Sequence, residues 1–312
     1  MIPRPGARAL KALALVIGLG AGNAWAHAVD GLDAHNLWSA WSTQAWLWLL
    51  WGLPGALVLL GIVRLWNQAG VGAGMRRWQA ACFLAGWLTL GLSIVSPLDA
   101  LGDELFWVHM VQHELVMLVA APLLVISRPL GALVWGLPPT WRTGSGRLAR
   151  RTGLQAAQRV LTRPFTAWWL HAVVLWGWHA PVLFQAALRT PWIHDLQHTS
   201  FFVSALVFWW ALLASHEGRR GKGMAVLYLF TTLLHTTLLG ALLTFSPRAW
   251  YAIYEERAPH WGLSAVEDQQ LGGLIMWVPG GTVFLAAALL LCLAWLRESP
   301  AETDPDGARR RG

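Results

Sequence analysis

The residues best suited to chemistry are two pairs of histidines, each pair spaced four residues apart inside an apolar stretch. HMVQHELVM carries His109 and His113, with Met117 four residues further on, and WIHDLQH carries His194 and His198. Residues four apart lie on one face of a helix, so each pair presents two imidazoles side by side. Imidazole nitrogen binds zinc, copper and iron, and a thioether shifts the preference toward copper. The spacing therefore predicts a metal site.

Other polar side chains share the apolar parts of the chain. His179 stands in WGWHAP, and Asp268 begins the run DQQLGGLIMW. Ionisable groups at membrane depth are costly and by default indicate function, although a helix-packing role stays open for each histidine. The predicted metal ligands are His109, His113, His179, His194, His198 and Asp268. Further ligands, or partners that orient the imidazoles, are Met117, His235, Glu114, Gln269, Met276 and His27.

The elements that must position these residues are membrane helices. Hydrophobic residues make up 56% of the 312 residues and charged residues 12%, a composition that excludes an ordinary soluble domain. Many of the 23 tryptophans flank apolar runs, as in the aromatic belts at membrane interfaces. The net charge of +7 comes from arginines in short loops, which fits membrane orientation better than nucleic-acid binding. We therefore expect the lipid bilayer, and not nucleic acid, as a partner.

The two ends of the chain lie outside the predicted membrane domain, residues 45–295. Residues 1–26 combine a basic start, a short apolar run and the ending Ala24-Trp25-Ala26, which predicts a signal peptide; an uncleaved anchor stays open. Cleavage there would leave His27 at the start of an outer segment, residues 27–44. Residues 296–312 form a polar tail that we expect to be disordered.

An all-α, polytopic fold follows, because a spanning segment must satisfy its own backbone hydrogen bonds. Pro54 and Pro279 should kink the first and last spans. Arginine-rich loops alternate with acidic ones, which places the mature N-terminus outside and the C-terminus in the cytoplasm. The histidine pairs then lie in the outer half of the membrane. The seven predicted spans cover about 45–66, 78–97, 106–126, 165–186, 198–214, 224–245 and 271–295.

Four motifs in order, HMVQHELVMLVAAPLLVISRP, WGWHAPVLF, WIHDLQH and DQQLGGLIMWVPGG, resemble the bacterial CtaG-like family of cytochrome c oxidase (caa-type) assembly factors. The resemblance extends from the first span to the seventh. It implies a seven-helix protein of the bacterial inner membrane that is needed to make active haem–copper oxidase, with copper delivery or insertion suspected. Oxidase subunits and a periplasmic copper chaperone are the implied partners. The positions that match are His109, His113, His179, His194, His198 and Asp268.

One departure from the family pattern is the ending ISRP, where we expect a small residue before proline. Arg128 lies at the predicted cytoplasmic end of its span, so the departure leaves the outer histidines untouched.

Three functions stay open. The first is a non-enzymatic assembly factor that holds copper, as Cu(I), in the outer histidine site and aids its insertion into the oxidase. The second is an intramembrane hydrolase of a lipid amide, in which zinc would activate water and Asp268 or Glu114 would be the base. The third is a haem-handling protein with paired histidine ligands.

Overall fold

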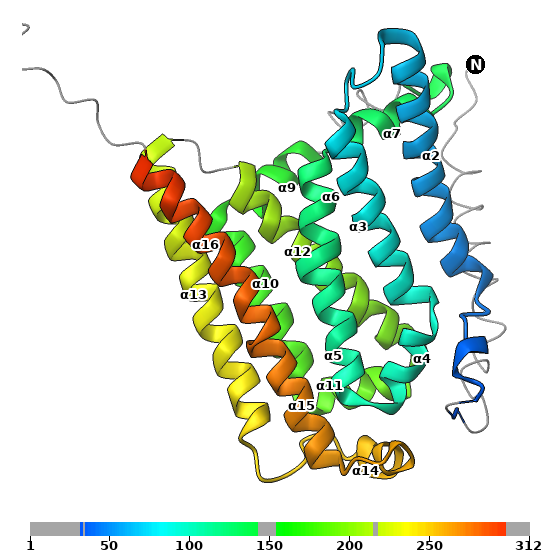
Figure 1. Cartoon of the computed structure of the whole chain (residues 1–312), viewed down its shortest axis with the longest axis vertical. Coiled ribbons are helices and arrows are strands. Elements are labelled where there is room, and N and C mark those ends of the chain that lie inside the picture. Colours follow the sequence, from blue (N-terminus) through cyan, green and yellow to red (C-terminus); the bar gives the residue numbers. More distant parts are fainter. Residues whose placement is uncertain (1–31, 34, 143–153, 215–217, 298–312) are drawn as a thin grey trace, which may run out of the picture.

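All regular structure in the described part of the chain, residues 32–33, 35–142, 154–214 and 218–297 of a computed structural model, is helical (Figure 1). This confirms the predicted all-α class. The helices are α2 (Ala45–Ala69), α3 (Arg77–Val95), α4 (Pro97–Glu104), α5 (Phe106–Glu114), α6 (Ala121–Ser127), α7 (Leu130–Gly136), α9 (Leu154–Leu161), α10 (Pro164–His179), α11 (Pro181–Arg189), α12 (Pro191–Ala214), α13 (Gly218–Thr244), α14 (Ile253–Arg257), α15 (Ala265–Trp277) and α16 (Pro279–Arg297).

Within these ranges, six helical segments are long and apolar enough to cross a membrane. The chain is therefore a membrane protein, but the predicted count of seven spans is not confirmed. The difference lies in the predicted span 165–186, which is divided into α10 and α11. Pro181 begins α11 because proline fits the first turn of a helix but not its interior. With 16 residues, α10 is shorter than the six, although it lies alongside α12 and α13.

The two prolines expected to kink the outermost spans behave differently. Pro54 lies inside α2 without ending it. Pro279 begins α16, after α15 has ended at Trp277. The predicted signal peptide, His27 and most of the predicted C-terminal tail lie outside the described residues.

The centre of the bundle is the segment Phe106–Ser127, made of α5, a π-helical segment (Leu115–Ala120) and α6. α5 packs against α4 and α15, and α6 packs against α3 and α12. The widened turn leaves the carbonyl of Met117 to accept a hydrogen bond of 2.9 Å from the indole of Trp209 on α12. Single π turns of this kind occur frequently at functional sites.

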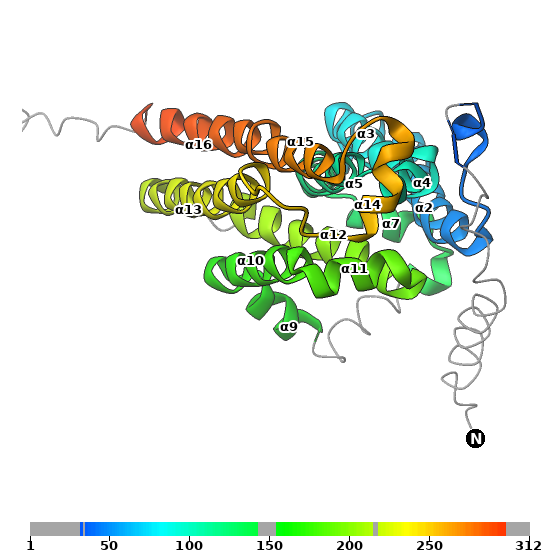
Figure 2. The same ribbon diagram turned by 90° about the horizontal axis from the view of Figure 1, so that it is seen from below.

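The short helices α4, α11 and α14 lie together at one end of the bundle, the lower end in Figure 1. We call this the cap end; Figure 2 views the molecule from it. α5 and α12 both begin there. The end is closed by buried aromatic rings, with Phe184 4.2 Å from Tyr251 and Phe106 5.0 Å from Tyr251, centroid to centroid. The sequence predicts that this end faces outward.

α2 is held mainly by the short helix α7, through close contact of the two backbones. A Cβ added at Gly61 would clash with the carbonyl oxygen of Ala132, and one added at Gly136 would clash with that of Leu57. Small residues of this kind let membrane helices approach closely.

Candidate metal centre

The two histidine pairs predicted from spacing face each other near the cap end of the bundle. His109 and His113 come from α5, and His194 and His198 come from the first two turns of α12. The ring of His109 lies 5.5 Å from that of His194 and 5.4 Å from that of His198, between centroids. His113 lies 4.9 Å from His198. Two faces predicted separately thus form one cluster of four imidazoles.

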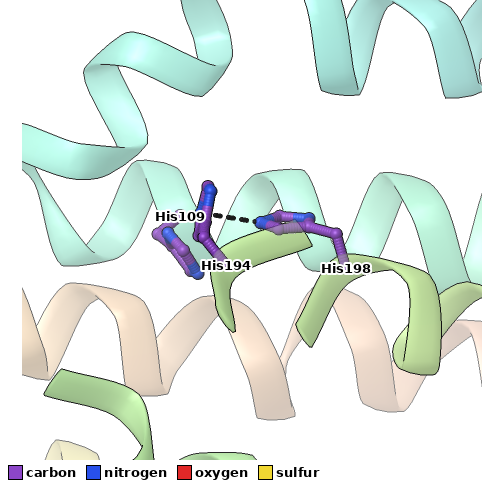
Figure 3. Close-up of side chains that lie close together, drawn as sticks. All are labelled: His109, His194 and His198. Atoms are coloured by element: carbon purple, nitrogen blue, oxygen red, sulfur yellow. Dashed lines mark hydrogen bonds between the residues drawn. The ribbon is translucent and has the colours of Figure 1, made fainter. Parts of the chain in front are cut away.

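Three of these rings lie close enough together to bind one metal ion. One ring nitrogen from each of His109, His194 and His198 lies within 4.8 Å of the other two (Figure 3). The Nε2 atoms of His194 and His198 are 3.0 Å apart. Three imidazole nitrogens around one point suit zinc, copper or iron.

The cluster also contains buried nitrogens that nothing satisfies. His109 is 0% and His113 2% exposed, and both nitrogens of each ring have no hydrogen-bond partner, nor does Nδ1 of His198. Buried polar groups are almost always paired, so an unpaired one requires an explanation. A bound ion is one such explanation. The walls are apolar, with Phe184 5.2 Å from the His109 ring and Phe201 4.5 Å from the His113 ring.

His179, at the end of α10, is oriented as a ligand would be. Its Nδ1 donates a hydrogen bond of 2.7 Å to the carbonyl of Leu175, which leaves the lone pair on Nε2, and that atom is buried without a partner. Such a bond fixes the tautomer of metal-binding histidines. The ring lies 6.2 Å from Phe201, beside the cluster rather than within the three-nitrogen group.

The backbone of His179 is fixed as well. The hydroxyl of Tyr251 donates to its carbonyl oxygen at 3.0 Å. Burial raises the pKa of Tyr251, so this phenol stays a neutral donor. The loop between α13 and α14 therefore holds the end of α10 in place.

Asp268 lies outside the three-nitrogen group and caps α5. Its two oxygens accept the backbone N–H groups of Phe106 and Trp107 at 2.8 and 2.9 Å. Leu105, at the N-cap position of α5, offers no side-chain acceptor, so these N–H groups need a partner from elsewhere. Asp268 thereby fixes the helix that carries His109 and His113.

Gln269 and Glu114 also lie away from the cluster. The amide of Gln269 accepts from the N–H of Trp250 at 2.6 Å and donates to the carbonyls of Leu243 and Arg248, which ties α15 to the end of α13. Glu114 lies against Gly280, where an added Cβ would be 2.6 Å from its Oε2 atom.

The remaining candidates make packing and hydrogen-bond contacts within the helix bundle. Met117 and Met276 are buried in the hydrophobic core of the bundle. His235, on α13, accepts a hydrogen bond of 3.4 Å from Trp176 and lies 5.3 Å from the ring of Trp168. His235 does not belong to the three-nitrogen group.

The sequence reasoning missed Gln197. It lies beside the His109 ring and is 1% exposed, and neither polar atom of its amide forms a hydrogen bond of ordinary length and angle. A signal was present, because Gln197 is three residues after His194 in WIHDLQH and therefore on nearly the same face of α12. Its amide can orient an imidazole or contact a ligand of the cluster.

Comparison with known proteins assigns the chain to a family. The chain is 27% identical over 266 residues to the uncharacterized protein Mb0105 of Mycobacterium bovis and, equally, to the uncharacterized protein MT0111 of Mycobacterium tuberculosis. The matches cover 80% of this chain but 40% of those proteins, so the chain spans less than half the length of these curated relatives. No solved structure matches. Residues 56–298 match the family model of the cytochrome c oxidase caa3 assembly factor, and the chain therefore belongs to the Caa3_CtaG family.

Proposed function

We propose that this assembly factor binds copper, as Cu(I), in the histidine cluster of α5 and α12 and aids its insertion into a haem–copper oxidase. The observation that carries the proposal is the group formed by His109, His194 and His198, whose ligand atoms lie within 4.8 Å of one another. His113 and His179 lie beside this group and serve as further ligands.

The chemistry of the cluster suits a cargo ion. Imidazole is a ligand for copper, and ligands from separate helices can leave one at a time. His194 is partly exposed while His109 is fully buried, so the ion can be received at a surface ligand and held at a buried one. The oxidase, supplied with copper at the outer face of the membrane, would be the recipient, and a periplasmic copper chaperone the donor.

The contacts of the two acidic candidates favour a carrier over a hydrolase. A zinc hydrolase would need a base beside the metal-bound water. Asp268 uses one oxygen for each of two backbone N–H groups, and Glu114 lies against Gly280 on α16. A protein that retains zinc and hydrolyses a lipid amide, or one that shows a haem Soret band, would contradict the copper proposal.

The test is the copper content of the full-length, detergent-purified protein after Cu(I) loading. The parent protein is compared with the double variant His109→Gln/His113→Gln and with His260→Gln. His260 is an exposed histidine near α14, so its substitution removes one imidazole from the protein but none from the cluster. We expect one copper ion per chain in the parent and in His260→Gln, and a loss in the double variant.

Equal copper in all three proteins would overturn the proposal, and so would its absence from all three. In cells, the double variant should lower the copper content and activity of the oxidase at unchanged levels of oxidase polypeptide. Normal oxidase copper in these cells would contradict a role in insertion.

A further inference from the structure

The side-chain amide of Gln197 is buried in the histidine cluster without a hydrogen bond of ordinary length and angle. The residue is 1% exposed, and neither Nε2 nor Oε1 forms such a bond. Gln197 lies on α12 between His194 and His198, and its amide lies beside the His109 ring. Burying an amide in this way is costly unless it gains a partner. Copper binding by the histidines alone would leave this amide without one.

His109 has the complementary requirement. Its ring is 0% exposed, and neither ring nitrogen forms a hydrogen bond of ordinary length and angle. A neutral imidazole has a lone pair on one nitrogen and a proton on the other. One nitrogen of His109 belongs to the three-nitrogen group, so binding of an ion there leaves the proton on the other nitrogen. That buried N–H then needs an acceptor.

Two polar groups lie beside the His109 ring, the backbone carbonyl of Gly102 and the amide of Gln197. The carbonyl of Gly102 already accepts the hydroxyl of Tyr254 at 3.0 Å. The amide of Gln197 has no ordinary partner. A hydrogen bond from His109 to Gln197 therefore satisfies two buried groups at once.

We infer that Gln197 is a positioning residue of the copper site. Its Oε1 accepts the N–H of His109, which keeps the lone pair of the other ring nitrogen directed at the ion. The terminal torsion of a glutamine side chain is broad, so a rotation of the amide brings Oε1 to the ring. This inference rests on the proposed function and names the residue that sets the tautomer and orientation of its buried ligand.

A neutral acceptor suits an ion that has to leave again. A carboxylate at this position would raise the basicity of the imidazole and add a negative charge beside the ion, and both effects strengthen metal binding. The amide of Gln197 fixes the His109 ring without adding that charge. Copper is thereby held in a defined geometry and can still be passed on.

The test compares Cu(I) affinities of the full-length, detergent-purified protein, measured by competition with bathocuproine disulfonate. We expect Gln197→Leu to weaken binding by about 10–100-fold, as the loss of a group that orients a metal ligand does. Gln197→Glu restores an acceptor and should bind copper at least as tightly as the parent. Gln158→Leu removes an exposed amide on α9 and should match the parent.

Two further measurements separate positioning from other roles. The unfolding midpoint of copper-free Gln197→Leu should not fall, because the amide that it removes makes no ordinary hydrogen bond. At saturating Cu(I), the copper K-edge spectra of the parent and of Gln197→Leu should show the same number of neighbours around copper. A neighbour lost in Gln197→Leu would make Gln197 a ligand and overturn the inference.

Two outcomes of the affinity measurement would overturn it as well. An unchanged affinity in Gln197→Leu would show that another group, such as the carbonyl of Gly102, accepts from His109. Binding by Gln197→Glu as weak as that by Gln197→Leu would show that the acceptor is not what matters at this position. Each of these results leaves copper binding by the histidines intact. A parent protein that binds no copper would instead end the proposed function.

Discussion

Substitution of Asp268 tests whether this residue stabilises helix α5 or binds the metal. The sequence places it among the ligands, whereas both of its oxygens cap α5 through Phe106 and Trp107, at 2.8 and 2.9 Å. Hydrogen bonds to a charged group contribute about 1.5–3 kcal/mol each. Asp268→Ala leaves two backbone N–H groups unpaired and should therefore cost about 3 kcal/mol at the lower end of that range. Asp268→Asn keeps one acceptor and should cost about half as much.

The assay combines thermal unfolding in detergent with copper content. A loss of about 3 kcal/mol corresponds to a fall in the unfolding midpoint of roughly 6–12 °C for Asp268→Ala. Copper should still bind at one ion per chain in Asp268→Asn, with lower affinity because His109 lies in the first turn of the helix that the cap holds. Glu255→Gln removes an exposed carboxylate on α14 and is the control. Loss of copper at an unchanged midpoint would refute the reasoning and make Asp268 a ligand.

Three further substitutions test the elements that position the cluster, each by the unfolding midpoint. Trp209→Phe leaves a carbonyl of the π-helical segment without its donor and should cost about 1 kcal/mol; an unchanged midpoint would show that this bond adds no stability. Gly61→Ala forces α2 away from α7 and should lower the stability by about 1–3 kcal/mol. The control Gly52→Ala has open space around its Cβ and should leave the stability unchanged. Equal midpoints for the two variants would contradict the close contact. Tyr251→Phe removes the hydrogen bond to the backbone of His179 and should cost about 1 kcal/mol, with copper content retained; full stability would mean that the end of α10 is held by other contacts.

Local patterns in the sequence predicted the membrane helices and the two histidine pairs. Long apolar runs predicted membrane helices, because a segment in lipid must pair its own backbone groups. The spacing of four residues predicted that His109 and His113 share one face, and likewise His194 and His198, since that spacing is a property of a single helix. Both expectations depend on neighbours in the chain, and the structure bears out the helical segments and both pairs.

The tertiary structure decided which helices and side chains contact one another. That the two histidine pairs face each other depends on the packing of the segment Phe106–Ser127 beside α12, and spacing along one helix says nothing about a second helix. Asp268 carries the chemistry of a ligand, but its oxygens reach N–H groups more than a hundred residues away, a pairing without a local signal. Gln197 belongs to the motif WIHDLQH, yet its position beside His109 follows from helix packing. Hydropathy could not show that the fourth predicted span divides at Pro181, because the apolar run continues through the break.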